Sequence, residues 1–339
     1  KGDAKLSLYA DDITSFLATL SSLAKILELF GIFGEASGAR LNRSKCKGMT
    51  ICNSHDQGNM AHKTDITWQD TIKIYGVYFG LRGQELTQEL VLNKLQGVVE
   101  FHRKRSLTMR GKALIINVLF LTRLWYAGTV ILFDADFIAK IQRVIFKFLW
   151  RTTEWLARQT VVGPVDQGGL GVLDINTRLA ALRVMHIKRF TFGDAVCWHS
   201  LAAYWIGFSV RQYNNTHARN TIVHAESERP AFYDKALRDF RRYLGMTNGD
   251  FNSTLKLRQV YKTLLNSVWR RPRVQSNDPS RLKMWQVLSD KLLDPRARDL
   301  LWRVGHEILT VRQTLTMRGM NVPQECGLCN RRVESVEHL

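Results

Sequence analysis

The hydrophobic period of the chain changes near residue 85, and this change sets the fold class. Before it, apolar and polar residues alternate in short runs such as 72–79, which is typical of half-buried β-strands. After it, apolar residues recur every three or four positions, as they do on the buried face of a helix. We therefore predict an α+β chain that is predominantly helical.

The first 40 residues predict a β-hairpin followed by a helix. Residues 6–16 form two strand-like halves around Asp11 and Asp12, and aspartate tolerates the geometry of a tight turn. Apolar residues in 17–30 recur with a helical period. Gly31 and Gly34 lie where that pattern stops, so we expect the helix to end there.

Positive charge dominates the chain and favours a polyanionic partner. The 339 residues include 49 Lys+Arg and 30 Asp+Glu, which gives a formal net charge of +19. Such an excess favours nucleic acid over a small uncharged substrate. Residues 94–158 hold 12 Lys+Arg against 4 Asp+Glu. From them we predict a set of phosphate-binding side chains: Arg103, Lys104, Arg105, Arg110, Lys112, Lys140, Arg143 and Lys147.

A second basic region, 229–273, holds 11 Lys+Arg against 3 Asp+Glu and is rich in aromatic residues. Aromatic rings among basic residues could stack on nucleic-acid bases, but rings at helical spacing are more often core residues. We favour the core interpretation. Residues 168–171, Gly-Gly-Leu-Gly, predict a turn between helical units rather than a phosphate-binding loop, because no strand precedes them and no helix follows directly.

Residues 113–133 are mostly apolar and long enough to be compared with a membrane span. Arg123 lies at the centre of this run, and a mid-bilayer arginine costs roughly 2.5 to 3.5 kcal/mol. We therefore expect buried helices and no membrane partner. The chain has five cysteines, an odd and sparse set that favours a reducing, intracellular compartment without disulfides.

Two sequence patterns predict metal ligands. Asp11 and Asp12 direct two carboxylates toward one small volume, which is unfavourable unless a cation lies there, and hard oxygen ligands suit Mg²⁺. Plain turn chemistry is the alternative explanation for this pair. Cys326 and Cys329, with His338, have the spacing of an incomplete zinc site in which the histidine approaches from a following helix. Two unrelated thiols and a surface histidine are the alternative.

Several motifs resemble a known family and occur in its order. Tyr9-Ala10-Asp11-Asp12 resembles the YxDD signature of reverse transcriptases. Five further motifs follow it along the chain: residues 37–46 (SGARLNRSKC), 72–80 (IKIYGVYFG), 105–112 (RSLTMRGK), 145–150 (IFKFLW) and 168–174 (GGLGVLD). They resemble successive blocks of LINE-type (non-LTR) retrotransposon reverse transcriptases, although Tyr75 stands where that family usually has leucine. The resemblance covers the chain and is weakest over 176–280.

The resemblance implies a domain organisation and site roles. It implies a truncated palm over 1–84, a helical thumb over 85–175, a helical connector over 176–300 and a helix with an incomplete zinc knuckle over 301–339. In the site, Asp11 would bridge two Mg²⁺ ions and Asp12 would be a secondary ligand. Tyr9 would position the turn, and Lys45 would steady phosphate charge.

The same resemblance implies partners and a limit on activity. The partners would be an RNA template, a DNA primer or target, and dNTP in the intact enzyme, which would act in the nucleus. The family's further metal-binding aspartate precedes the YxDD hairpin, so we expect this chain to be a C-terminal fragment that is inactive alone. The fourth zinc ligand would fall beyond Leu339.

Two other functions fit part of the sequence. A catalytically dead nucleic-acid-binding remnant would keep the basic helices and the zinc knuckle without using the carboxylates. A group II intron maturase also carries YADD, but the GGLG turn and the terminal Cys/His motif favour the non-LTR family.

Overall fold

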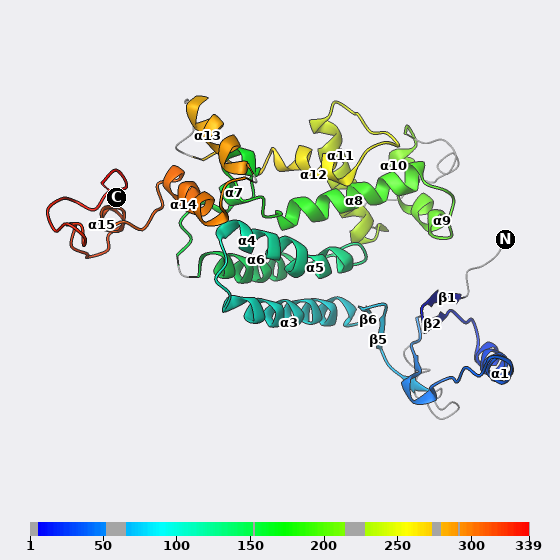
Figure 1. Ribbon diagram of the computed structural model, residues 1–339. Coiled ribbons are helices and arrows are strands. Elements are labelled where there is room, and N and C mark those ends of the chain that lie inside the picture. The colour runs from blue at the N-terminus through cyan, green and yellow to red at the C-terminus, as the bar shows by residue number, and fades with distance from the viewer. Residues whose placement is uncertain are drawn as a thin grey trace. The chain divides into compact units, whose positions relative to one another are not determined.

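The computed structural model describes residues 6–51, 66–151, 153–213, 228–272, 279–290 and 292–338. The chain divides into two compact units (Figure 1). The first contains 1–93, 130–133 and 189–234, and the second contains 94–129, 134–188 and 235–339. Helices predominate, and the described strands form three two-stranded sheets, so the predicted α+β, mainly helical class is confirmed.

Two antiparallel hairpins organise the first unit. In one, Leu6 lies opposite Ser15 and Tyr9 opposite Asp12, as the alternating sequence predicts. In the other, Tyr75 and Gly76 form the turn with φ angles of 47° and 86°, the pair of positive values that a type I′ hairpin turn requires. The strands are β1 (Leu6–Tyr9) with β2 (Asp12–Ser15), β5 (Thr71–Ile74) with β6 (Val77–Gly80), and a short parallel pair, β3 (Lys47–Gly48) with β4 (Thr67–Trp68).

Helix α1 (Leu20–Ser37) corrects one prediction. Thr19 caps its start by accepting a hydrogen bond from the Ser22 backbone nitrogen at 3.2 Å. The helix continues through Gly31 and Gly34 and ends where Gly38 takes a φ of 75°. Glycine inside a helix costs only about 1 kcal/mol, whereas the left-handed residue at Gly38 terminates it. In its described ranges this unit also contains α9 (Trp198–Ala202) and α10 (Phe208–Val210), joined by a π-helical stretch over Ala203–Gly207.

The second unit is a helical assembly around an apolar core. Its helix α6 (Ala135–Trp150) buries one face, including Ile141, Ile145 and Leu149, while Lys140, Arg143 and Lys147 are exposed on the opposite face, as predicted. The other helices are α4 (Met109–Ile115), α5 (Thr122–Ala127), α7 (Arg158–Val161), α12 (Leu257–Leu265), α13 (Pro279–Ser289), α14 (Pro295–Gly305) and α15 (Arg312–Met317). Three helices run from one unit into the other: α3 (Gly83–Arg103), α8 (Ile175–Phe192) and α11 (Ala231–Met246).

The apolar run 113–133 is interrupted rather than continuous. Helix α4 passes into a π-helical stretch over Ile116–Phe120, and α5 ends before Gly128. None of the helices in the described ranges is long and apolar enough to cross a membrane.

The predicted turn over 168–171 is also present. Gly168 and Gly171 have φ angles of 87° and 67°. A side chain at Gly169 would lie 2.0 Å from the carbonyl oxygen of Gly163, so only glycine allows this close approach.

Candidate metal centres and nucleic-acid interface

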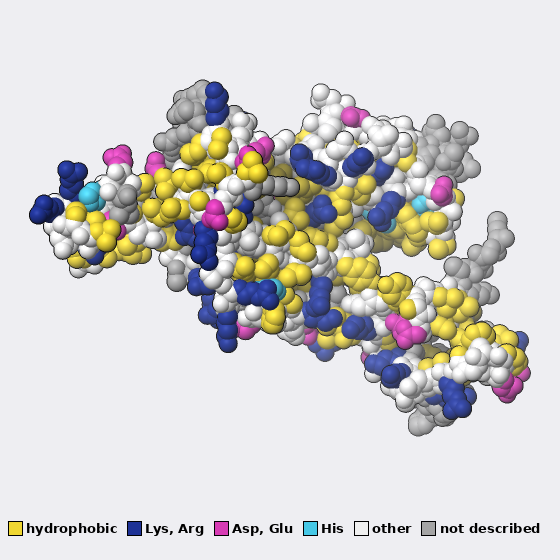
Figure 2. Space-filling view, in the orientation of Figure 1, with side chains coloured by type: hydrophobic (Ala, Val, Ile, Leu, Met, Phe, Trp, Pro, Cys, Tyr) yellow, Lys and Arg dark blue, Asp and Glu magenta, His cyan; other side chains and the backbone are white. Residues whose placement is uncertain are grey.

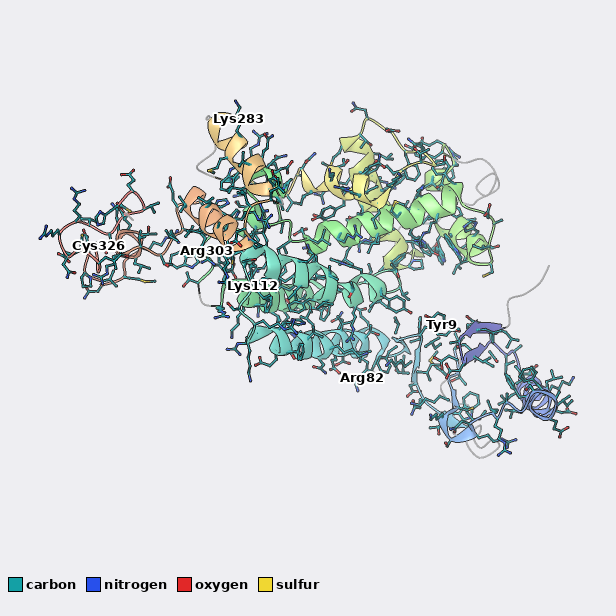
Figure 3. The ribbon with its side chains drawn as sticks, viewed as in Figure 1. Tyr9, Arg82, Lys112, Lys283, Arg303 and Cys326 are labelled. Atoms are coloured by element: carbon teal, nitrogen blue, oxygen red, sulfur yellow. The ribbon has the colours of Figure 1, made fainter. Side chains whose placement is uncertain are left out.

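The turn between β1 and β2 presents the two aspartates at the surface. Ala10 and Asp11 form the turn, and Ala10 has a φ of 53°. Tyr9, Asp11 and Asp12 are all exposed, and Tyr9 lies at the end of β1 (Figure 3). The hairpin therefore exposes carboxylate oxygens, which are the type of ligand that Mg²⁺ prefers.

The β5–β6 hairpin braces this turn through Tyr75. The rings of Tyr9 and Tyr75 pack edge to face with centroids 5.6 Å apart. The Tyr75 hydroxyl donates a hydrogen bond of 3.1 Å to the Ser7 hydroxyl on β1. Residues almost 70 positions apart thus meet, and Tyr75 is a contact that sequence reasoning missed. Its departure from the family's usual leucine was the available signal.

The described residues give Asp11 and Asp12 no third ligand. Among those residues, the one group of three Cys, His, Asp or Glu side chains close enough to hold a metal is elsewhere, at the C-terminal end. Lys45 lies in a short 3₁₀ turn, Arg43–Lys45, and no described contact joins its ammonium group to either carboxylate. Two exposed carboxylates alone hold Mg²⁺ weakly.

The C-terminal cluster consists of Cys326, Cys329 and His338. Their ligand atoms all lie within 4.8 Å of one another, and the Cys329 sulfur lies 3.2 Å from Nε2 of His338. Cys326 is buried, on the loop that follows α15 (Figure 3). His338 lies in a turn and not in the helix that we expected, because its backbone nitrogen bonds back to Ser335.

Backbone contacts also hold the loop around the cluster in place. Glu325 and Val333 form an antiparallel bridge, and the Cys326 nitrogen donates to the carbonyl of Arg332 at 2.7 Å. Backbone N–H groups of Arg331 and Arg332 hydrogen-bond to Cys329 and lower the pKa of its thiol to about 7. Zinc binds thiolate rather than thiol, so this lowered pKa fits a zinc ligand.

Most of the predicted phosphate-binding residues are exposed. Arg103, Lys104 and Arg105 lie exposed at and just beyond the end of α3. Arg103 pairs with Glu100 at 3.4 Å, and the Arg105 guanidinium lies 5.1 Å from the centre of the Phe101 ring. Figure 2 shows Lys and Arg side chains gathered around the end of α3 and around α4.

Lys112 is placed differently from our expectation. It is only 8% exposed, and its ammonium group donates a hydrogen bond of 2.7 Å to the carbonyl oxygen of Leu149 at the end of α6. It is buried because Met109 and Ala113, on the same helix, pack into the core and bring Lys112 against α6. Lys112 therefore cannot contact phosphate from the outer surface. Arg110 is half-buried, and burial lowers the pKa of its guanidinium.

The aromatic residues of 229–273 mostly belong to the core, as favoured. Phe240, Tyr243, Phe251 and Tyr261 are each at most 8% exposed. Phe240 and Phe251 pack edge to face with centroids 4.7 Å apart. These rings are unavailable for base stacking.

Two comparisons with known proteins agree with this site. Residues 264–339 match the family described as zinc-binding in reverse transcriptase. The chain is 30% identical over 292 residues to the transposon TX1 uncharacterized 149 kDa protein of Xenopus laevis. That alignment covers 79% of this chain and 22% of the relative, so the chain spans about a fifth of the relative's length.

The zinc-binding match and the cysteine–histidine cluster define a reverse-transcriptase-related protein. The similarity to a transposon protein extends over most of the chain and adds transposons to this description. Together the two matches confirm the resemblance to the reverse transcriptases of non-LTR retrotransposons.

Proposed function

We propose that this chain forms part of an RNA-directed DNA polymerase that copies the element's RNA from the 3′ end of a nicked DNA strand. One observation carries the proposal: the turn of β1 and β2 exposes Asp11 and Asp12, and a second hairpin braces it through Tyr75. The partners would be an RNA template, a DNA primer and dNTP. The site of action would be the nucleus, where the target DNA lies.

In this proposal each residue of the turn has one role. Asp11 and Asp12 would hold Mg²⁺, with Asp11 as the principal ligand and Asp12 as a secondary one, and Tyr9 would fix the turn against Tyr75. Lys45 steadies phosphate charge. The metal would supply charge stabilisation there, for the attacking 3′-hydroxyl and for the leaving pyrophosphate.

The larger segments are proposed to follow the family's organisation: a truncated palm over 1–84, a helical thumb over 85–175, a helical connector over 176–300, and a helix with an incomplete zinc knuckle over 301–339. Apolar exposure in the first unit supports a palm that needs further protein around it. Leu8 is 66% exposed on β1, and Ile32 and Phe33 are 58% and 59% exposed on α1. Apolar groups gathered at a surface in this way mark a contact with another protein surface. We propose that the remainder of the polymerase covers them.

Primer extension tests the proposal. We expect no extension of a DNA primer on an RNA template by this chain alone, because two carboxylates hold Mg²⁺ weakly. The same chain joined to the upstream reverse-transcriptase region of its own element should extend the primer. Failure of the longer protein to extend any primer, when folded and supplied with Mg²⁺, would contradict the proposal.

A second candidate is a nucleic-acid-binding protein without catalysis. The exposed basic side chains on α3 and α6, together with the absence of a third described ligand at Asp11 and Asp12, favour it. It predicts that the longer protein binds RNA–DNA duplex and yet extends no primer, so the same experiment separates the two functions.

A further inference from the structure

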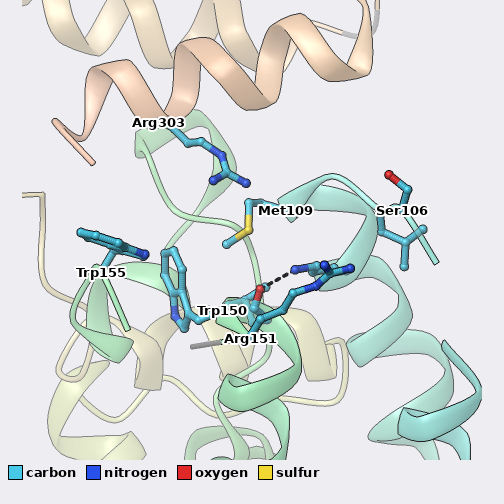
Figure 4. Close-up of a pocket in the computed structure, with 9 residues that line it drawn as sticks. Ser106, Met109, Trp150, Arg151, Trp155 and Arg303 are labelled. Carbon is cyan, nitrogen blue, oxygen red and sulfur yellow. Dashed lines mark hydrogen bonds between the residues drawn. The ribbon is translucent and has the colours of Figure 1, made fainter. Parts of the chain in front are cut away.

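A basic pocket lies within the second unit, among the start of α4, the end of α6 and α14 (Figure 4). Its volume is about 270 Å³, which is enough for one phosphate group with its sugar and too small for a base pair. Lys112, Arg151 and Arg303 supply its positive charge, and Trp150, Trp155 and Ser106 also line it. From the sequence we predicted Lys112 as a phosphate-binding residue and did not single out the two arginines.

The positive charge of the pocket is not balanced by the carboxylate beside it. Asp299 pairs with Arg303 at 3.1 Å, and its other oxygen accepts a hydrogen bond of 2.7 Å from the Met109 backbone nitrogen. Both oxygens are therefore engaged. In the described part of the chain, Arg151 makes no ion pair. One carboxylate thus faces three cations.

The pKa of Lys112 reflects its burial and its repulsion by the two arginines. Burial, followed by the charges of Arg151 and Arg303, lowers the pKa of its ammonium group to about 8. Crowding like charges in a partly dehydrated pocket is unfavourable unless an anion offsets it. Arg151 directly follows α6 and has a φ of 67°, so its backbone leaves the helical conformation at this residue.

The other lining residues fit a nucleotide better than a simple carboxylate. Trp150 is 8% exposed, and its indole nitrogen has no hydrogen-bond partner among the described residues. The guanidinium carbon of Arg318 lies 4.4 Å from the centre of the Trp155 ring, a cation–π contact. One guanidinium group can donate two parallel hydrogen bonds to a phosphate group, and a sugar or base can pack against an aromatic ring.

We propose that this pocket binds one phosphate group of a single-stranded nucleic acid through Arg151 and Arg303, with the attached nucleoside against Trp155. The inference rests on the nucleic-acid role proposed above and adds a defined subsite to it. The phosphate is either the terminal 5′-phosphate or an internal phosphodiester.

The test uses the full chain and two variants that each remove one charge. Arg151→Gln removes a pocket cation, and Lys283→Gln is the matched control because Lys283 is exposed on α13 and does not line the pocket (Figure 3). Binding of a short, 3′-labelled single-stranded RNA is measured by fluorescence anisotropy, with either a 5′-phosphate or a 5′-hydroxyl. Inorganic phosphate is titrated by calorimetry as an independent probe.

We expect Arg151→Gln to weaken RNA binding about 10-fold and Lys283→Gln at most about 2-fold, because a hydrogen bond to a charged group is worth more than a surface charge. Inorganic phosphate should bind the wild type and not Arg151→Gln. Tighter binding of the 5′-phosphate RNA assigns the pocket to the strand end, and equal binding assigns it to an internal phosphodiester.

Arg303→Gln provides a second pocket variant, with thermal melting used to verify folding. Equal binding by both pocket variants and the Lys283→Gln control would overturn the inference while leaving nucleic-acid binding intact. Failure of the wild-type chain to bind any RNA would instead contradict the proposed function.

Discussion

Nε2 of His306 lies 2.7 Å from the carbonyl oxygen of Gly168, deep in the second unit. A carbonyl oxygen can only accept, so the imidazole must carry its proton on Nε2 and donate it. Trp302 donates to the same oxygen at 2.9 Å. The glycine turn over 168–171 thus contacts α14 and its C-terminal end through two hydrogen bonds to the Gly168 carbonyl oxygen.

His306 should make the protein sensitive to acid. Burial lowers the pKa of its imidazole from 6.5 to about 4. The unfolded chain therefore takes up a proton below pH 6.5 that the folded chain refuses until about pH 4. The contribution of His306 to the free energy of unfolding is fully present above pH 6.5. It falls by up to about 3 kcal/mol as the pH drops toward 4. Urea unfolding followed between pH 7 and 4.5 measures this loss.

The matched variant is His306→Gln, which keeps a hydrogen-bond donor and cannot titrate. It should be less stable than the wild type at pH 7 and lose less stability on acidification. An identical pH slope in the two proteins would show that another group controls acid unfolding.

A buried ion pair joins α8 to α11, and breaking it should be costly. Arg183 Nε donates to Asp239 at 2.6 Å, and each side chain is 8% exposed. Asp239→Asn should lower the free energy of unfolding by about 3 to 5 kcal/mol because it leaves an uncompensated buried charge. The double variant Arg183→Met/Asp239→Leu should lose less. Chemical denaturation measures both, and a larger loss in the double variant would contradict this account.

The C-terminal cluster should bind a thiophilic metal. Cobalt added to a chain that extends past Leu339 should produce thiolate charge-transfer and tetrahedral d–d bands, and Cys329→Ser should abolish them. Cys197→Ser, at an exposed cysteine outside the cluster, should leave the bands unchanged. Because the pKa of Cys329 is about 7, cobalt binding should strengthen as the pH rises through 7. Bands that survive Cys329→Ser would exclude this residue as a ligand.

The exposed basic residues at the end of α3 should control the salt dependence of binding. If Arg103, Lys104 and Arg105 each contact a phosphate, replacing all three by Gln should lower the slope of log K against log salt concentration by about 2 to 3. Duplex binding is measured at salt concentrations from about 50 to 200 mM to obtain this slope. An unchanged slope would move the surface to α12, where a triple replacement of Lys256, Arg258 and Lys262 should then lower it.

The sequence predicted what depends on local pattern. The alternation in 6–16 predicted the β1–β2 hairpin, and the helical period of 137–150 predicted the buried and exposed faces of α6. It did not predict the burial of Lys112, because that depends on how α4 packs against α6. The sequence also did not predict the contact of Tyr9 with Tyr75, because local patterns carry no information on which distant hairpins pack together.

The central claim is that the turn of β1 and β2 carries catalytic carboxylates. Asp11→Asn preserves the shape of the side chain and removes its charge, and Asp194→Asn makes the same change at an exposed position of the first unit that is not part of the hairpin. The decisive measurement is the single-turnover rate of primer extension by the longer protein with each change. We predict that Asp194→Asn keeps the wild-type rate and that Asp11→Asn loses on the order of 10³-fold or more, as expected when a group that stabilises the transition state is removed. Equal rates for Asp11→Asn and the wild type would contradict the account.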